Sequence, residues 1–440
     1  MKIKNITIIV FLMLTLIGCE KREEGSEDKR IPITIGTFLV ENREGFDDAR
    51  KRFEEENPDY RIEIREYNSE DEYKRFLVEL STGKAPDIID MGNLPAREYI
   101  SLGLFEDLKP YFDKDPDISE NDLIDPVINA IKADGRIYYT ASSFGINTLV
   151  ASKKDIGDKK GWTVSEMSAY VESKGNDVQI IPGNSKTNIL GLFTYSSIDD
   201  YIDWKNGRAS FDNDEFKKIL ELSDRGLDDM GEKNPGERKS DLFSSGRLCF
   251  DNLVCAGAPD IAALRGRLKV ETVPIGYPCK DRQGSQFILK EQYGMSSSST
   301  HKDAAWNYLK IIMSKDHQYK VMYPFYTFAP TRKDCFDMYI EAMKAQKTYI
   351  DKEGNTVSPI SVEYADDDSD LGYVQGPLSD DDIDAFIEIL NNTHRICEWE
   401  HSLSDIINEE ARKYFQKERT LDETVTIIND RIEKYISERK

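Results

Sequence analysis

Histidine and cysteine are scarce in this sequence of 440 residues, which holds four of the first and six of the second. The histidines form no HExxH motif, no two cysteines have the CxxC spacing, and the two residue types do not cluster. Metal sites built from nitrogen and sulfur ligands need such clusters. We therefore expect no zinc site, no other metal centre and no cofactor.

Positive charge is also in short supply, because 59 Lys and Arg residues stand against 82 Asp and Glu residues. The formal net charge of −23 argues against a nucleic acid or an anionic membrane surface as a partner. Solubility is the simplest interpretation of this acidity. Long apolar runs are missing too: after the N-terminal segment, no stretch approaches 18 apolar residues.

The N-terminal segment has the pattern of a secretion signal. Lys2 and Lys4 precede an apolar run of 12 residues, from Ile6 to Ile17, whereas a membrane-spanning helix needs about 20. The run ends in Leu16-Ile17-Gly18-Cys19, which resembles a bacterial lipobox. The alternative is an ordinary buried N-terminal strand or helix that carries a cysteine by chance.

The lipobox resemblance implies that residues 1–18 are removed and that Cys19 becomes an acylated N-terminus. Residues 19–30 would then be a polar tether, with too few apolar residues to pack. Five cysteines remain, and Cys249 and Cys255 would lie about 20 Å apart on one strand, beyond disulfide reach. We expect buried free thiols, and one long-range disulfide stays open as an alternative.

The first part of the mature chain predicts a parallel sheet. Its apolar residues alternate, then recur at helical spacing, and then alternate again, in the order strand, helix, strand, helix, strand within about 60 residues. Ser69 and Glu72 form a capping box that starts the second helix. Ligands on such sheets bind beyond the carboxyl ends of the strands. That rule indicates two loops, Val40 to Gly45 and Asp90 to Pro95.

Further along, periodicity predicts short strands and amphipathic helices. We expect a turn at "TASSFGIN" between strands at 136–139 and 148–151, and further strands at 248–253 and 270–274. Helices are expected after Trp162, at 212–223, at 304–313, and in two C-terminal stretches. Thr163 with Glu166 and Thr420 with Glu423 form two more capping boxes, which start the helix after Trp162 and the last C-terminal helix. The stripe of Val425, Ile428, Ile432 and Ile436 is interpreted as core packing. The acidic segment 364–372 is interpreted as a solvated loop, because it lacks the EF-hand spacing for calcium.

Several segments, taken together, resemble extracellular solute-binding proteins of family 1, the maltodextrin-binding-like type. The segments are "RFEEENPDYRIEI", "LSTGKAPDIIDMG", "YISLGLFEDLKPYFDKD", "DGRIYYTASSFGINTLVASKKD", "GRLCFDNLVCAGAPD", "YGMSSSSTHKDAAWNYLKIIMSKDHQ" and "IINEEARKYFQKERTLDETVTIINDRIEKYISE". The chain departs from the family where a proline is usual near Thr140 and Tyr-Asn-Lys is usual at 151–153. It also lacks the family's ligand-stacking tryptophan, with Val254 or Cys255 at the rough equivalent.

The resemblance implies an α/β, two-lobed fold like that of periplasmic binding proteins, with a hinge, a ligand cleft between the lobes and a helical C-terminus. The first lobe would comprise residues 31–142 with 295–335, and the second 143–294 with 336–440. Such a protein captures a small solute, most often a sugar or oligosaccharide, by lobe closure. It delivers the solute to an ABC permease from the outer face of the membrane, tethered by the lipid on Cys19, and we expect a monomer.

Candidate ligand-binding residues come from loops at predicted strand ends and from positions that the resemblance places at the ligand. Each has a plainer alternative, such as a solvated loop, hinge filling for Phe144 or core packing for Tyr326. Trp162, Trp306 and Trp399 are interpreted as structural. The candidates are Glu41, Asn42, Asp90, Asn93, Phe144, Trp204, Asp251, Asn252, Tyr293 and Tyr326.

Two other classes remain open at the level of sequence. A secreted glycoside hydrolase needs a pair of carboxylates, which any acidic chain can offer, but no GxSxG, P-loop or dinucleotide motif stands in a suitable context. We therefore expect no enzyme. A binding protein that presents its ligand to a membrane receptor would share the same fold. The sequence does not identify the solute.

Overall fold

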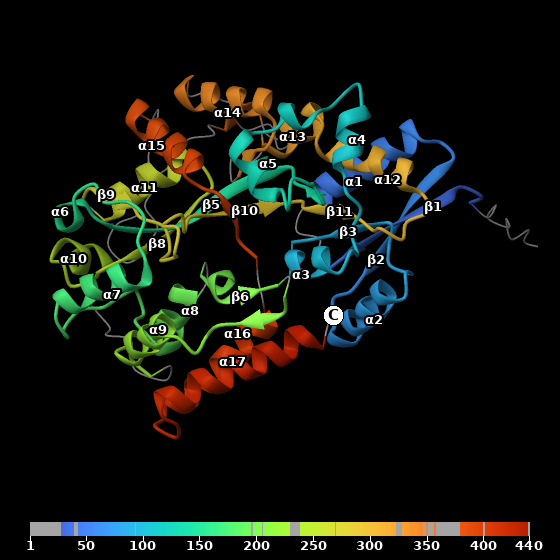
Figure 1. Ribbon diagram of the computed structural model, residues 1–440. Helices are drawn as coiled ribbons and strands as arrows, with labels where there is room; N and C mark the ends of the chain where they lie inside the picture. The colour runs from blue at the N-terminus through green and yellow to red at the C-terminus, as the bar shows by residue number, and fades with distance from the viewer. Residues whose placement is uncertain are drawn as a thin grey trace, which may run out of the picture.

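The computed structural model describes residues 28–38, 43–92, 94–194, 197–204, 206–228, 238–268, 270–322, 328–345, 349–350, 356–357, 379–398 and 401–438. Two separate sheets organise these residues, and Figure 1 shows helices gathered around each of them. We call the two halves the first lobe and the second lobe. No helix in the described ranges is both long enough and apolar enough to cross a membrane.

The first lobe is built on a five-stranded sheet with the order β2-β1-β3-β11-β4. Strand β1 is parallel to β2 and β3, as the sequence pattern predicts, and β11 is antiparallel to β3 and β4. Its elements are β1 Ile31–Thr37, α1 Arg43–Glu56, β2 Tyr60–Glu66, α2 Glu70–Ser81, β3 Ile88–Asp90, α3 Ala96–Ser101, α4 Lys109–Lys114, η1 Glu120–Asp122, α5 Asp125–Ile131, β4 Tyr139–Thr140, β11 Tyr293–Met295, α12 Lys302–Ile312 and α13 Lys315–Met322.

The second lobe is built around β5, which pairs with β12, β10, β8 and β9. Its elements up to β12 are β5 Ser143–Ser152, α6 Lys153–Ile156, α7 Val164–Ser173, α8 Lys186–Thr194, η2 Ile198–Tyr201, β6 Ile202–Asp203, β7 Arg208–Ala209, α9 Asp214–Asp224, α10 Lys239–Ser244, β8 Asp251–Cys255, α11 Ala258–Leu268, β9 Thr272–Pro274, β10 Gln286–Lys290 and β12 Ala329–Pro330.

The C-terminal part of the chain is mainly helical, as expected. Helices α16 and α17 pack as a hairpin on the second lobe and run along the lower side of the molecule in Figure 1. The elements of this part are α14 Lys333–Ala345, β13 Tyr349–Ile350, β14 Thr356–Val357, α15 Asp380–Asn391, β15 Arg395–Ile396, α16 His401–Phe415 and α17 Leu421–Ser437.

Local sequence signals explain where several helices begin. Ser69, Thr163 and Thr420 each accept a hydrogen bond from the backbone N–H three residues later, and the glutamate at that position bonds back to the cap. These three capping boxes confirm the predicted starts of α2, α7 and α17, because they satisfy amide groups that the first helical turn leaves without partners.

Two large apolar clusters stabilise the fold. One joins the first-lobe sheet to one face of the second-lobe sheet, and the other lies beneath the helices of the second lobe and the C-terminal hairpin. The predicted stripe on α17 belongs to the second cluster, with Val425, Ile428 and Ile432 almost fully buried. Trp162 and Trp306 are also buried, which agrees with their structural interpretation, whereas Trp399 and segment 364–372 lie outside the described residues.

Four predicted features are corrected by the structure. The "TASSFGIN" segment is not a turn, because residues 143–147 are the first half of β5, which is buried along its whole length and shows no alternation. The strand expected at 136–139 is shorter and begins later, because β4 spans only Tyr139–Thr140. Asp134 and Gly135, just before the expected strand, have positive φ and form a tight turn. Strand β8 begins three residues later than expected. Tyr293, which the predicted limits of 143–294 assign to the second lobe, lies in the first-lobe sheet.

The five cysteines after Cys19 are all free thiols. Cys249, Cys255, Cys279 and Cys335 are buried, and Cys397 is half-buried. The prediction of buried free thiols is therefore confirmed for four of them, and the alternative of a long-range disulfide is wrong.

A buried carboxylate ties the first-lobe sheet to the turn before α12. Asp87 accepts hydrogen bonds from the Thr34 amide (2.9 Å), the Thr34 hydroxyl (2.8 Å) and the Ser299 hydroxyl (2.6 Å). Burial by itself raises the pKa of Asp87, but these hydrogen bonds outweigh it and hold the pKa below its ordinary value. The carboxylate therefore stabilises the fold above about pH 4, and this contribution is lost as the pH falls through the lowered pKa.

We expect Asp87→Asn to reduce the free energy of unfolding at pH 7 by about 2 kcal/mol. The reason is that the donors of Thr34 and Ser299 would then face a neutral amide instead of a carboxylate. Urea titrations at pH 7 and at about pH 2.5 measure the effect, and the difference between variant and wild type should shrink at the lower pH, where the wild-type carboxylate becomes protonated. Asp59→Asn, at an exposed position, serves as the control. Equal losses of stability at both pH values would contradict the prediction.

Candidate functional site

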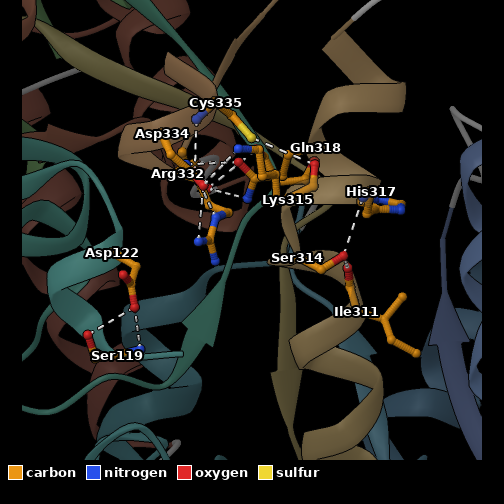
Figure 2. Close-up of polar contacts among 12 residues, drawn as sticks. Ser119, Asp122, Ile311, Ser314, Lys315, His317, Gln318, Arg332, Asp334 and Cys335 are labelled. Atoms are coloured by element: carbon orange, nitrogen blue, oxygen red, sulfur yellow. Dashed lines mark hydrogen bonds and ion pairs between the residues drawn. The ribbon is translucent and has the colours of Figure 1, made fainter. Parts of the chain in front are cut away.

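Three segments connect the lobes, and hydrogen bonds from α13 lead to two of them. The segments are residues 141–142, residues 291–292, and the stretch between α13 and β12. Gln318 donates to the Thr331 hydroxyl (2.9 Å) and accepts from the Arg332 amide (2.8 Å). Figure 2 shows Gln318 next to Arg332. Thr331 in turn donates to the carbonyl of Ala141 (2.7 Å).

The neighbouring residue on α13, His317, contacts the connection at 291–292. His317 Nε2 lies 2.9 Å from Glu291 Oε2, and both side chains are largely buried. His317 therefore contacts the connection at 291–292 directly, and Gln318 reaches the connection at 141–142 through Thr331. This arrangement defines where the lobes meet and where any hinge motion must occur.

Beside these connections, one face of the second-lobe sheet carries a row of polar side chains. In the register of the sheet, Asn147 of β5 lies between Val254 of β8 and Gln286 of β10. Because alternate residues of a strand share a face, Gly145 and Ile288 lie on this face one step nearer the connections. We call this surface the second-lobe strip; it consists of Gly145, Asn147, Asn252, Val254, Gln286 and Ile288.

The strip combines apolar and polar groups, with open surface at one edge. Val254 is 47 % exposed and Asn252 is exposed, whereas Asn147 and Gln286 are buried. Farther along β5, the same face is covered, since Leu149 packs in the second-lobe core. Mixed surfaces of this kind, with a few fixed amides among apolar groups, are typical of small-molecule sites.

Tyr277 orients the amides of the strip. Its hydroxyl donates to Asn147 Oδ1 at 2.8 Å and also contacts Asn252 Oδ1. With their oxygens turned toward one phenol, the two asparagines have defined orientations before any ligand arrives. Preorganised amides bind hydroxyl groups with less loss of side-chain entropy.

An aromatic ring lies on the strip next to the connections. Phe328 is half-buried, and its Cε1 would lie only 2.7 Å from a Cβ atom at Gly145. Lys290 Nζ lies 5.3 Å from the centroid of the ring. Residue 145 therefore has to be glycine for this ring to lie against β5, and the ring supplies aromatic surface near the position where the family's tryptophan is missing.

The charge of a half-buried arginine beside the strip is already neutralised. Arg395 lies 2.9 Å from Asp281 Oδ2 and 3.5 Å from Asp200 Oδ1. Burial raises the pKa of Asp281, but hydrogen bonds from the Gln283 amide, Cys279 and Arg395 outweigh it and leave the pKa below its ordinary value. Asp281 is thus an anion at neutral pH, and Arg395 serves as its partner.

In the first lobe, two of the predicted site residues are brought together. Asp90 and Tyr293 are register partners on β3 and β11. Asp90 is half-buried and accepts from the Gly92 amide at 2.9 Å. Burial raises the pKa of Tyr293 well above its ordinary value, so its phenol stays protonated and packs edge-on against Tyr308.

Two predicted residues lie on the wrong face of the second-lobe sheet for the strip. Phe144 is fully buried and packs against Phe287 and Phe386, so it fills the core and offers no stacking surface. Asp251 is buried, and its Oδ2 lies 3.2 Å from Arg267 Nη2. Its neighbour Asn252 does face the strip, because successive strand residues point to opposite sides.

The remaining predictions are placed as follows. Trp204 follows β6 and packs, half-buried, against the second-lobe core. Four candidates and the predicted lipidation site lie outside the described residues: Glu41, Asn42, Asn93, Tyr326 and Cys19.

Sequence reasoning missed Gly145, Asn147, Tyr277, Gln286 and Phe328. The alternation of Ser143, Gly145 and Asn147 was a signal for a strand with one small and polar face. The signal was hard to recognise because β5 is buried on both faces, so its sequence does not alternate between apolar and exposed polar residues.

Comparisons with known proteins agree with this architecture. The profile of a family described as bacterial extracellular solute-binding protein matches residues 48–349. Among solved structures, an ABC substrate-binding protein of Listeria monocytogenes in complex with cycloalternan is 16 % identical, with a TM-score of 0.53, 93 % of this chain covered and 99 % of that one. The sugar-binding protein MalE of Xanthomonas citri is 15 % identical, with a TM-score of 0.56 and coverage of 93 % and 98 %.

A third solved structure has the same fold over its whole length. The cyclic alpha-maltosyl-1,6-maltose binding protein of Arthrobacter globiformis is 15 % identical, with a TM-score of 0.52, 93 % of this chain covered and 100 % of that one. At these identities the likeness shows the fold, a two-lobed α/β arrangement with a helical C-terminus.

Proposed function

The chain belongs to the bacterial extracellular solute-binding proteins, and from that premise we propose that it captures a sugar or oligosaccharide between its two lobes. The observation that carries the proposal is the second-lobe strip with Phe328 beside it. It offers fixed amides for hydroxyl groups and an aromatic ring for the apolar face of a pyranose. Three relatives in fold are named for carbohydrate ligands, which supports the same solute class.

Closure would complete the site with residues of the first lobe. Asp90 ends the third strand, at the sheet edge where ligands of α/β folds bind, and Tyr293 lies beside it. A solute that touches both lobes binds the closed state better than the open one and shifts the equilibrium toward it. The domain limits and the candidate residues other than Phe144 and Asp251 remain part of this proposal.

A thermal-shift screen against sugars, peptides and polyamines tests the solute class. A carbohydrate at 100 times its Kd should stabilise the native state by about 2.7 kcal/mol and raise Tm accordingly. A shift with a peptide or a polyamine, and none with any carbohydrate, would overturn the sugar proposal and leave the family unaffected.

Asn252→Ala should weaken binding of the sugar found in that screen about tenfold, because one preorganised hydrogen bond is removed from the open edge of the strip. Isothermal titration measures the change. Asn121→Ala, at an exposed position of the first lobe, is the matched control and should bind like the wild type. Unchanged affinity in Asn252→Ala would remove the open edge of the strip from the proposed site.

Delivery to an ABC permease and anchoring by a lipid on Cys19 complete the proposal. The family is extracellular, which agrees with the secretion signal predicted at residues 1–18. Detergent phase partitioning of the protein from a bacterial host, compared with Cys19→Ser, tests the anchor.

A further inference from the structure

Helix α17 is fixed to the second lobe along most of its length. Its residues Val425, Ile428 and Ile432 lie in the second-lobe core. Asn429 Oδ1 accepts from the Phe211 amide at 2.9 Å, and Glu433 Oε1 accepts from the Ala209 amide at 3.2 Å. A helix of 17 residues held in this way moves with its lobe as one rigid element.

The last turn of α17 reaches the first lobe. The Tyr435 hydroxyl donates to Glu98 Oε2 at 3.4 Å, and Glu98 on α3 is only 3 % exposed. In Figure 1, α17 runs from beneath the second lobe toward the side of the molecule where α2 and α3 are drawn. The helix α3 is itself held in the first lobe, where Tyr99 bonds to Tyr73 of α2 at 3.1 Å.

A second contact joins the same two parts. Glu398, which follows β15 of the second-lobe sheet, accepts from the Arg97 amide at 3.3 Å and lies 3.6 Å from Arg97 Nε. The side chain of Glu398 is 13 % exposed, so the pair is partly shielded from water. Arg97 and Glu98 are adjacent on α3, which brings both contacts to one short helix.

We infer that these contacts form a latch that stabilises the arrangement of the lobes in this structure, which we call the closed state, with Arg97 and Glu98 on one side and Glu398 and Tyr435 on the other. The latch lies outside the three connecting segments, so rotation of the lobes about those segments displaces its two sides relative to each other and breaks these contacts. Contacts present only in the closed state favour that state. This role rests on the proposed closure of the lobes around a solute. The C-terminal helix α17 would then regulate that closure through residues that need not touch the solute.

The latch sets how much of the protein is closed before any solute binds. A larger closed fraction reduces the rearrangement that binding requires, and it slows the release of solute by holding the lobes together. Tyr435 and Glu398 are therefore positioning residues for capture.

Single-molecule energy transfer on the solute-free protein tests the latch. Dyes attached through unnatural amino acids at Val78 and Asn176, both exposed and in different lobes, report the separation of the lobes. Tyr435→Phe removes only the hydroxyl and should raise the ratio of open to closed molecules roughly fivefold, as the loss of one hydrogen bond allows. Glu398→Gln should change the ratio in the same direction.

Tyr414→Phe is the matched control, because Tyr414 lies on α16, packs against the second-lobe core and takes no part in the latch. It should leave the ratio unchanged, and circular dichroism checks that each variant is folded. An unchanged ratio in both Tyr435→Phe and Glu398→Gln would overturn the latch. Because the measurement uses no solute, failure of the sugar screen leaves this result standing, and failure of the latch leaves the screen standing.

Discussion

Replacing Glu410 with glutamine should lower the free energy of unfolding by about 3 kcal/mol, the largest loss of stability that we expect from a single neutral replacement. Glu410 lies on α16 and is 2 % exposed. Its carboxylate contacts Arg419 and Arg431 and accepts from Lys413 Nζ at 3.0 Å. A glutamine keeps the shape but removes the negative charge, which leaves three cations around a buried neutral group.

The cost should appear as a lower denaturation midpoint with an unchanged m-value, because the C-terminal hairpin packs into the second-lobe core and unfolds with it. Glu409→Gln is the control: Glu409 is adjacent and also contacts Arg431, at 2.8 Å, but its side chain is 58 % exposed. Exposed pairs contribute at most about 1 kcal/mol. Equal effects in the two variants would contradict the assignment of the stability to the buried carboxylate.

The parts of the fold that were predictable depend on local signals. The capping boxes at Ser69, Thr163 and Thr420 involve residues three apart, and the parallel strands at the start of the chain follow from alternation within seven residues. The short strand β4 and the long strand β5 were mistaken because their boundaries depend on partners far along the chain. Strand β5, for example, pairs with β8, β9, β10 and β12.

The site was harder to predict than the fold for the same reason. Asp251 and Asn252 are adjacent and equally polar, and only the register of β8 against β5 shows which one faces the strip. Phe328 lies 183 positions after Gly145 in sequence, yet its ring restricts that position to glycine. The sequence did indicate that the usual stacking tryptophan is absent, but the aromatic ring that lies nearby comes from another segment.

That ring leads to the largest effect on binding that we expect. Gly145→Ala should weaken sugar binding by about 30-fold or more, because the new Cβ would lie 2.7 Å from Phe328 Cε1 and 3.1 Å from the Cys255 carbonyl oxygen. The carbonyl is fixed in the β5–β8 pair, so the ring has to move away from the strip. Phe328→Ala should weaken binding to a similar extent, since burial of a Phe side chain against a ligand contributes about 1.5–3 kcal/mol.

A double-mutant cycle separates this explanation from general damage to the second lobe. If Gly145→Ala acts by displacing the ring, then adding it to Phe328→Ala should cost little further affinity, because the ring that it displaces is already gone. Titration calorimetry of the four proteins with the same sugar gives the coupling, and thermal unfolding shows whether each is folded. Additive losses in the double variant would show that Gly145 and Phe328 act independently, and would remove the ring as the reason for glycine at position 145.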